Sequence, residues 1–163
     1  MAGSTPHPLV RAADVSRERE EHFAHPLNPS SDLWGVSLSE SAGMQRIGLH
    51  RIRVPPGKEA FIYHDHVLEE EFVYVLSGRG IAEIDGSEYE VGPGDFMGFP
   101  TPSVAHHMRN PFDEDLVYLA GGERREVEIA SFPHLGKHLI RIGGEAKLVD
   151  SRQLQSFWRR DDD

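Results

Sequence analysis

The central part of the chain is a series of short β-type segments, and turn residues separate each segment from the next. Valine, isoleucine, tyrosine and phenylalanine are frequent in these segments, while glycine, proline and aspartate interrupt them. The segments that we expect to be strands cover residues 46–54, 61–66, 71–76, 81–84, 89–91, 96–99, 105–109 and 116–120. Asp85 and Gly86 form a type I′ hairpin signal between two of them. Short strands at close, even spacing, with no long amphipathic helix among them, predict an all-β barrel or sandwich with antiparallel pairing.

The composition limits the class of protein. A chain of 163 residues is long enough for one domain with a buried core. The formal charge of −10 at pH 7 argues against nucleic acid or an anionic membrane as the main partner. The chain has no cysteine, so disulfides and thiolate metal sites are excluded. No apolar run has the length of a membrane span, and the N-terminus lacks the hydrophobic region of a signal peptide, so we expect a cytoplasmic protein.

We expect three parts along the chain. Residues 1–32 are rich in proline, serine and charge and have no sustained periodicity, so we interpret them as an N-terminal arm. Residues 33–122 contain the strand pattern of the barrel. Residues 123–163 form a C-terminal extension with an acidic tail, which we expect to pack on the barrel or on a second subunit.

Two histidines stand two positions apart just before the most strand-like segment. Side chains at positions i and i+2 of a strand point to the same face, roughly 7 Å apart, so His64 and His66 can converge on one ion while Asp65 points away. The alternative is a pair of surface histidines on an edge strand. Without cysteine, a metal here would be bound through imidazole and carboxylate groups, which suit iron, manganese, nickel or zinc.

A carboxylate partner is available in the acidic run Glu69, Glu70 and Glu71. If Val73 and Val75 face the interior of the barrel, Glu71 shares their phase and also faces inward. Glu70 is out of phase and Glu69 belongs to the preceding turn, so we interpret both as solvated charges. A carboxylate inside a barrel is costly unless it meets a cation, and Glu71 is therefore the candidate ligand.

A fourth ligand is expected from His106 or His107 in the second histidine-containing segment. Neighbouring strand residues face opposite sides of a sheet, so only one of the two can point inward. His106 shares its phase with Met108, whereas His107 shares its phase with Arg109. A methionine suits an enclosed pocket better than an arginine does, so the phase argument favours His106 and leaves His107 on the outward face.

The first histidine segment resembles a motif of the cupin superfamily. That motif reads G-x(5)-H-x-H-x(3,4)-E-x(6)-G, and the segment from Gly57 to Gly78 is similar to it, with one additional residue before His64. The glutamate of the motif falls on Glu71.

The second histidine segment resembles the second cupin motif, G-x(5)-P-x-G-x(2)-H-x(3)-N, between Gly94 and Asn110. Pro102 stands where the motif has glycine, and one additional residue precedes the histidine. The spacing to Asn110 agrees with the motif for His106 and disagrees for His107. The resemblance covers residues 47–120.

The resemblance implies an all-β fold, a single double-stranded β-helix barrel of the cupin or jelly-roll type with extended N- and C-terminal arms. It also implies one divalent transition metal ion (Fe, Mn, Ni or Zn) with an open coordination position, bound by His64, His66, Glu71 and His106. An open position distinguishes catalytic from structural metal sites. Because exposed sheet edges have to be covered, we further expect a homodimer in which aromatic residues of the two extensions cover them, namely Trp34, Phe132, Phe157 and Trp158.

The residues around the site predict a largely apolar pocket. We expect the pocket to be lined by Ile62, Tyr63, Val73 and Met108. Arg51 or Arg53 at the mouth of the barrel could hold an anionic group, or both are surface arginines opposite acidic neighbours.

Two classes of function are consistent with these features. The first is a metal-dependent enzyme, an oxygenase acting on a small chelating organic substrate, with isomerisation and decarboxylation as other reactions found among cupins. The second is a non-catalytic cupin that binds a sugar or another small regulatory ligand. The presence of all four ligand residues favours the enzyme.

Overall fold

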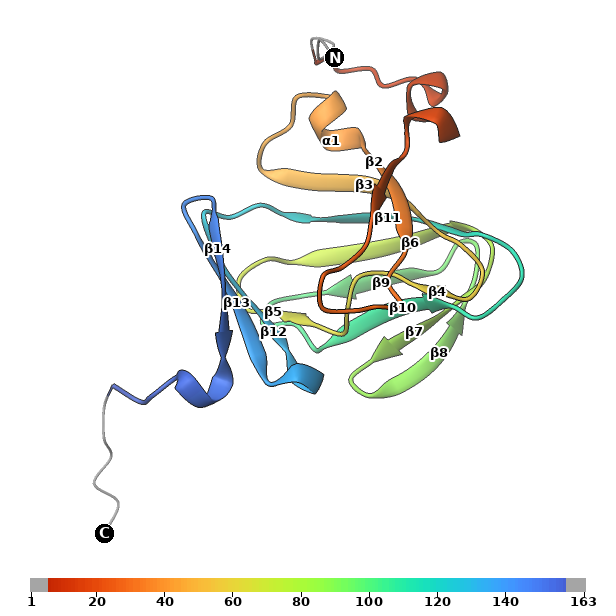
Figure 1. The fold of residues 1–163 in the computed structure, drawn as a ribbon. Coiled ribbons are helices and arrows are strands. Elements are labelled where there is room, and N and C mark those ends of the chain that lie inside the picture. Colours follow the sequence, from red (N-terminus) through yellow and green to blue (C-terminus); the bar gives the residue numbers. More distant parts are fainter. Residues whose placement is uncertain (1–5, 158–163) are drawn as a thin grey trace.

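The computed structural model describes residues 6–157, which form mostly antiparallel β-structure in three sheets (Figure 1). A six-stranded sheet has the order β1-β2-β3-β11-β6-β9, with the strands Glu21–Phe23, Leu33–Ser37, Ile47–Val54, Leu116–Glu123, Glu71–Ser77 and Phe96–Phe99. A four-stranded sheet has the order β4-β10-β7-β8, with the strands Lys58–Glu59, His106–Asn110, Gly80–Ile84 and Ser87–Val91. The third sheet has the order β14-β13-β12-β5, with the strands Glu145–Asp150, Lys137–Ile142, Val127–Phe132 and Asp65–His66.

Helices in the described part of the chain are short. They are the α-helix α1, Leu38–Ser41, and 3₁₀ turns at Ala12–Val15, Arg17–Arg19, Pro133–Leu135 and Ser151–Gln153. Within residues 6–157, no helix has the length and apolar character needed to cross a membrane. The expected all-β class is therefore confirmed, and the fold depends on strand pairing.

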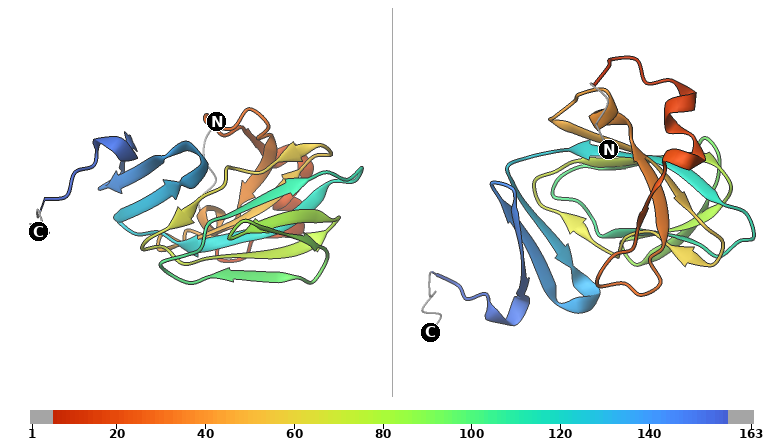
Figure 2. Two further views of the ribbon diagram at one scale, coloured as in Figure 1. Left: turned by 90° about the horizontal axis from the view of Figure 1, so that it is seen from below. Right: turned by 45° about the horizontal axis from the view of Figure 1, so that its top comes forward.

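The first two sheets face each other and enclose the hydrophobic core (Figures 1 and 2). Strand β6 contributes to this core through alternate residues: Val73 and Val75 are buried, while Tyr74 and Leu76 are exposed on the other face. The inward phase predicted for the two valines is confirmed. The core that they join also contains Leu33, Ile52, Val54, Ala60, Ala82, Val91, Phe99, Met108, Leu116, Tyr118 and Ala120.

The hairpin expected at Asp85 and Gly86 connects β7 to β8. Both turn residues have positive φ, 50° and 73°, as a type I′ turn requires, and Ile84 pairs with Ser87 across the turn. The strand expected over residues 61–66 is wrong in most of its length, because only Asp65–His66 pairs as a strand, β5.

Both terminal segments join the sheets of the central barrel. The N-terminal strand β1 pairs with β2 at the edge of the six-stranded sheet. The C-terminal strand β12 pairs with β5, and β13 and β14 extend this third sheet away from the barrel (Figure 2). Phe132 is only 4% exposed inside this arrangement, so the expectation that it covers a sheet edge across a dimer is wrong. Trp158 and the acidic C-terminal tail lie outside the described residues.

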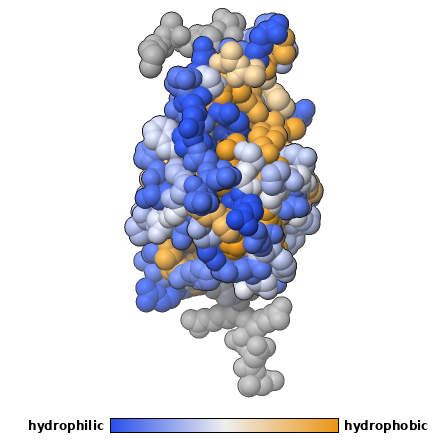
Figure 3. Space-filling view, turned by 90° about the vertical axis from the view of Figure 1, so that its right-hand side faces the viewer, coloured by the Kyte–Doolittle hydropathy of each residue, from blue (hydrophilic) through white to orange (hydrophobic). Residues whose placement is uncertain are grey.

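Several large hydrophobic side chains remain on the surface. Figure 3 shows hydrophobic residues gathered along one side of a face that is otherwise mainly hydrophilic. On the outer face of the six-stranded sheet, Tyr74 pairs directly with Phe96, and these side chains are 40% and 65% exposed. The ring of Phe96 also stacks on that of Phe72, with 6.0 Å between ring centroids.

Candidate metal centre

His64 and His106 are brought together by a β-bridge between two segments that are distant in the sequence. The backbone N–H of His64 donates to the carbonyl of His106 at 3.1 Å, and the N–H of His106 donates back to His64 at 2.8 Å. Directly opposed residues of an antiparallel pair present their side chains on the same face. The two imidazole rings consequently lie side by side, with 4.7 Å between centroids.

Glu71 occupies the middle of the cluster. It begins β6 in the same phase as Val73 and Val75, so its carboxylate points inward. Its Oε2 atom lies 3.2 Å from Nε2 of His66, 3.2 Å from Nε2 of His106 and 3.8 Å from Nε2 of His64. The ligand atoms of the four residues all lie within 4.8 Å of one another, so the ligand set expected from the sequence forms a cluster that could hold a metal ion.

The contacts of the Nδ1 atoms of His64 and His106 determine that Nε2 of each imidazole faces this cluster. Nδ1 of His64 contacts the carbonyl oxygen of Ile62 at 2.6 Å, and Nδ1 of His106 contacts that of Val104 at 3.1 Å. A protonated Nδ1 that donates to a carbonyl leaves Nε2 unprotonated and available as a ligand. Three Nε2 atoms and a carboxylate oxygen directed at one point fit a divalent transition metal.

The electrostatics of the cluster favour positive charge. Burial raises the pKa of the Glu71 carboxyl, but contacts with the imidazoles of His106, His64 and His66 outweigh it and hold this pKa well below its ordinary value. Burial lowers the pKa of His66, and the neighbouring Glu71 carboxylate outweighs that effect, so the net shift is upward. An ionised carboxylate at the centre of three imidazoles is what a bound cation requires.

The remaining acidic and imidazole candidates lie elsewhere. His107 points to the opposite side of β10, where its Nε2 lies 3.6 Å from a carboxylate oxygen of Glu59. Glu70 is exposed, and its backbone N–H donates to Glu123. The interpretation of Glu69 as a solvated charge is wrong, because it is only 7% exposed and its carboxylate accepts from the guanidinium of Arg141. A turn residue can be buried when a distant strand supplies its partner, and β13 does so here.

The cluster is accessible from an open cavity of about 380 Å³. The side chains of His64, His66 and Glu71 are 16%, 17% and 22% exposed, whereas that of His106 is 6% exposed. Other charged or titratable residues on the cavity wall are His50, Glu69, Glu70, Glu123, Arg124 and Arg141. His50, Arg124 and Arg141 were not expected at the site from the sequence, although the alternation of β3 around the buried residue Ile52 could have indicated His50.

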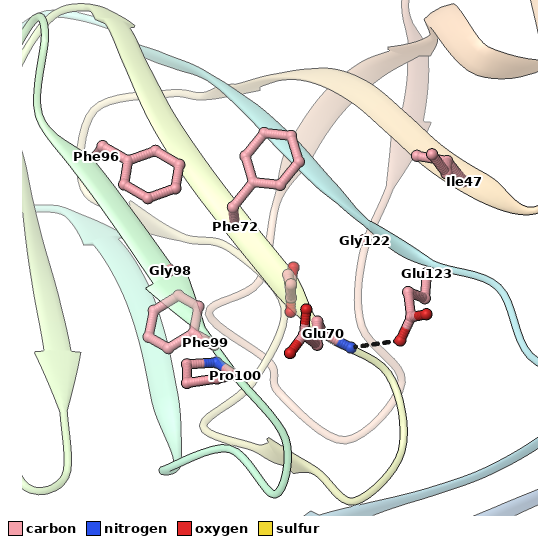
Figure 4. A pocket seen from close by; sticks show the side chains of 10 residues that line it. Ile47, Glu70, Phe72, Phe96, Gly98, Phe99, Pro100, Gly122 and Glu123 are labelled. Atoms are coloured by element: carbon pink, nitrogen blue, oxygen red, sulfur yellow. Dashed lines mark hydrogen bonds between the residues drawn. The ribbon is translucent and has the colours of Figure 1, made fainter.

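A second pocket of about 410 Å³ lies on another side of Glu71 and is mainly aromatic. Figure 4 shows Phe72, Phe96 and Phe99 around it, with Glu70 and Glu123 joined by a hydrogen bond at its other end. Phe99, which lines this pocket, also stacks its ring on the imidazole of His106.

The pocket residues expected from the sequence divide into two groups. Ile62, Val73 and Met108 line a cavity of only about 20 Å³ beside His64 and His106, and they are not among the residues that line the open cavity of about 380 Å³. Tyr63 points away from it, because the N–H of Gly86 donates to the Tyr63 hydroxyl and the Tyr63 ring stacks on His134.

Arg51 and Arg53 also lie outside the cavity. Ile52 and Val54 take the inward phase of β3, so the two arginines point to the outer face, where both pair with Glu20 of the N-terminal segment. Of the two positions expected for these arginines, the outer surface opposite an acidic neighbour is therefore correct, and the mouth of the barrel is wrong.

The fold and the histidine–glutamate cluster define a cupin barrel, and comparison with known proteins agrees. The family model for the cupin domain matches residues 50–121. This chain belongs to the cupin superfamily.

Two solved structures are similar over almost the whole chain. A protein from Acidithiobacillus ferrooxidans, described provisionally as a sugar phosphate isomerase, is 39% identical, with a TM-score of 0.88 over 93% of this chain and 97% of that chain. A cupin-superfamily sugar phosphate isomerase from Silicibacter pomeroyi is 22% identical, with a TM-score of 0.79 over 90% and 94% of the two chains. The second likeness shows the fold alone.

Two curated relatives match shorter stretches. Sulfate adenylyltransferase subunit 1 of Aeromonas salmonicida is 28% identical over 58% of this chain and 21% of its own length. An uncharacterized protein of Methanocaldococcus jannaschii is 37% identical over 35% of this chain and 44% of its own length. The chain thus spans less than half the length of either curated relative.

Proposed function

We propose that this cupin is a mononuclear metal-dependent enzyme that isomerises a small phosphorylated sugar. The observation that carries the proposal is the position of the Glu71 carboxylate, whose Oε2 lies within 3.8 Å of three Nε2 atoms at the wall of an open cavity. A bound divalent metal would polarise a carbonyl or hydroxyl oxygen of the substrate as a Lewis acid. The residues that would hold it are His64, His66, Glu71 and His106.

The cavity suits a small molecule with several hydroxyl groups. Its volume of about 380 Å³ is at the lower end of the range for small-molecule sites. Carboxylates of Glu70 and Glu123 on its wall can accept hydrogen bonds from hydroxyl groups. The carboxylate and guanidinium groups on this wall favour a sugar over the diketone or phenol that an oxygenase would take.

Two arginines on the same wall support recognition of a phosphate group. Arg124 contacts Glu40 at 3.1 Å and Arg141 pairs with Glu69, yet the two side chains are 33% and 32% exposed. A guanidinium has five N–H donors, more than one carboxylate engages, so both arginines keep donors for an anion. The similar protein from A. ferrooxidans, described provisionally as a sugar phosphate isomerase, is consistent with this substrate class.

His50 is positioned to transfer the proton that an isomerisation requires. It lies half-buried on the cavity wall, and burial together with the charge of Arg124 lowers the pKa of its imidazole, which is therefore neutral at pH 7. Interconversion of an aldose and a ketose moves a proton between neighbouring carbons without net oxidation. We assign to His50 the removal of the proton from the hydroxyl-bearing carbon beside the carbonyl and its return to the carbonyl carbon, while the proton of that hydroxyl group passes to the former carbonyl oxygen.

The first experiment tests metal binding and turnover together. The purified chain is loaded separately with Fe²⁺, Mn²⁺, Ni²⁺ and Zn²⁺, its metal content is measured, and aldose and ketose phosphates are followed by NMR. We expect about one metal ion per chain, isomerisation with at least one metal, and retention of the metal but loss of turnover in His50→Gln. Arg141→Lys tests phosphate recognition and should raise KM more than it lowers kcat.

Other results would decide against this function. Oxygen uptake with a chelating acid and no isomerisation would favour the oxygenase expected from the sequence. Tight binding of a sugar without turnover, under all metals, would favour the non-catalytic alternative. A wild-type chain that takes up none of the four metals would refute the metal centre itself.

A further inference from the structure

A buried carboxylate outside the two cupin motifs lies directly behind one of the candidate ligands. Strand β12 pairs antiparallel with β5, so Ala130 stands opposite His66. Glu128 is two residues from Ala130 and therefore presents its side chain on the same face of the sheet as His66. Alternation along β12 places Glu128 among the buried positions, and it is 1% exposed.

The contacts of Glu128 hold its carboxylate in place and direct it towards the imidazole. The backbone N–H of Val67 donates to Oε1 at 3.0 Å, and the N–H of Leu68 donates to Oε2 at 3.2 Å. Oε1 also lies 3.6 Å from Nδ1 of His66. These contacts orient one carboxylate oxygen towards the side of His66 that faces away from Glu71.

Nδ1 of His66 differs from the same atom in the other two candidate ligands. In His64 and His106 this nitrogen has a carbonyl partner, whereas in His66 it is buried without a hydrogen-bond partner among the described residues. Burying an unpartnered polar atom is costly, and the Glu128 carboxylate beside it has acceptor capacity beyond the two backbone N–H groups that donate to it. A hydrogen bond from Nδ1–H to Oε1 of Glu128 would give this nitrogen a partner after a movement of a few tenths of an ångström.

We propose that Glu128 is a positioning residue of the metal centre, which accepts a hydrogen bond from Nδ1 of His66 and thereby presents Nε2 to the metal. This inference rests on the proposed binding of a metal. A carboxylate behind a ligating imidazole fixes its tautomer and ring orientation and makes Nε2 a stronger donor. The C-terminal extension, through β12, is then part of the metal centre and not only a cover for the barrel.

The test compares the wild-type chain with Glu128→Gln, which preserves the shape of the side chain and removes its charge. Affinity for Zn²⁺ is measured by competition with a chelator, and the visible spectrum is recorded with Co²⁺. We expect affinity to fall roughly 10- to 100-fold, with an altered Co²⁺ spectrum. Glu128→Asp should recover more of the affinity than Glu128→Gln does.

The matched control is Glu69→Gln, because Glu69 is a second buried carboxylate near His66 that is already paired with Arg141. It should leave the Co²⁺ spectrum unchanged even if it lowers the melting temperature. Wild-type affinity and an unchanged spectrum in folded Glu128→Gln would overturn the inference while leaving the metal centre intact. Two metal ions per wild-type chain, one of them lost in Glu128→Gln, would make Glu128 a ligand and overturn it as well.

A measurement on the wild-type chain covers the case in which the variants fail to fold. In the Zn²⁺-loaded protein with ¹⁵N-labelled histidine, Nδ1 of His66 should carry a slowly exchanging proton while Nε2 shows the shift of a metal-bound nitrogen. A metal-bound Nδ1, or an Nδ1 without a proton, would refute the role of Glu128. Absence of any metal-induced shift would instead refute the proposed metal centre, and the inference with it.

Discussion

The imidazole of His106 lies flat against the ring of Phe99, with 3.7 Å between the ring centroids and 8° between the ring planes. Phe99 is 4% exposed at the end of β9, and its backbone partner across the sheet is Glu71. Phe99 therefore contacts two candidate ligands: its ring packs against His106, and its backbone pairs with Glu71. This packing restricts the rotation of His106 before any metal binds.

We predict that Phe99→Leu weakens metal binding as well as stability. Loss of the ring stacking should cost about 0.5–1.5 kcal/mol in the free energy of unfolding, and the freer imidazole should lower Zn²⁺ affinity several-fold. Thermal unfolding of the metal-free chain and chelator competition measure the two effects. Phe72→Leu is the control, since Phe72 lines the aromatic pocket without stacking on a ligand, and equal affinity losses in both variants would contradict the prediction.

The two neighbouring histidines of β10 should behave differently. His106→Ala should abolish stoichiometric metal binding, because its Nε2 is one of the atoms that face Glu71. His107→Ala should retain the metal, because His107 faces Glu59 on the opposite side of the strand. Elemental analysis after dialysis decides the matter, and loss of metal in His107→Ala alone would show that the fourth ligand has been assigned to the wrong residue.

His50 should make the folded chain less stable in weakly acidic solution. Burial, with Arg124 nearby, holds its pKa below the ordinary value of 6.5. The unfolded chain thus binds a proton at His50 more readily than the folded chain does. The contribution of His50 to the free energy of unfolding therefore becomes less favourable to the fold as pH falls below 6.5. The unfolding free energy of the wild type, measured relative to that of His50→Gln, should decrease from pH 7 to pH 5.

Removal of the Arg124 charge should change the pKa of His50. Arg124→Gln removes a positive charge that lowers the pKa of His50, so NMR titration should show that pKa moving upward. A downward shift, or none, would mean that the charge of Arg124 does not lower the pKa of His50.

The homodimer expected from the sequence remains a prediction, and we propose that the outer face of the six-stranded sheet takes part in it. Phe96 and Tyr74 oppose each other there and are 65% and 40% exposed. Sedimentation should give a dimer for the wild type and a monomer for Phe96→Glu. Tyr89→Glu, at a residue 53% exposed on β8 of the other sheet, should leave the dimer unchanged. A monomeric wild type would refute the expectation.

Much of the candidate site follows from local pattern. The alternation of β6 selects Glu71 over Glu70 on the condition that Val73 and Val75 face inward, and the burial of both valines meets that condition. Glu69 was misassigned for the converse reason, since its burial depends on Arg141, a residue of β13 that no local pattern connects to it. The local pattern left two positions open for Arg51 and Arg53, because their partner, Glu20, lies in a segment without periodicity.

The amino-acid sequence by itself determined the all-β class, the hairpin at Asp85 and Gly86 and the four residues of the candidate metal centre. Strand alternation and turn chemistry are local properties, and they can be read from neighbouring residues. Only the tertiary structure placed Glu128 behind His66 and His50 on the wall of the cavity. These contacts depend on which distant strands pair and in which register, and that choice is made by the packing of the whole chain.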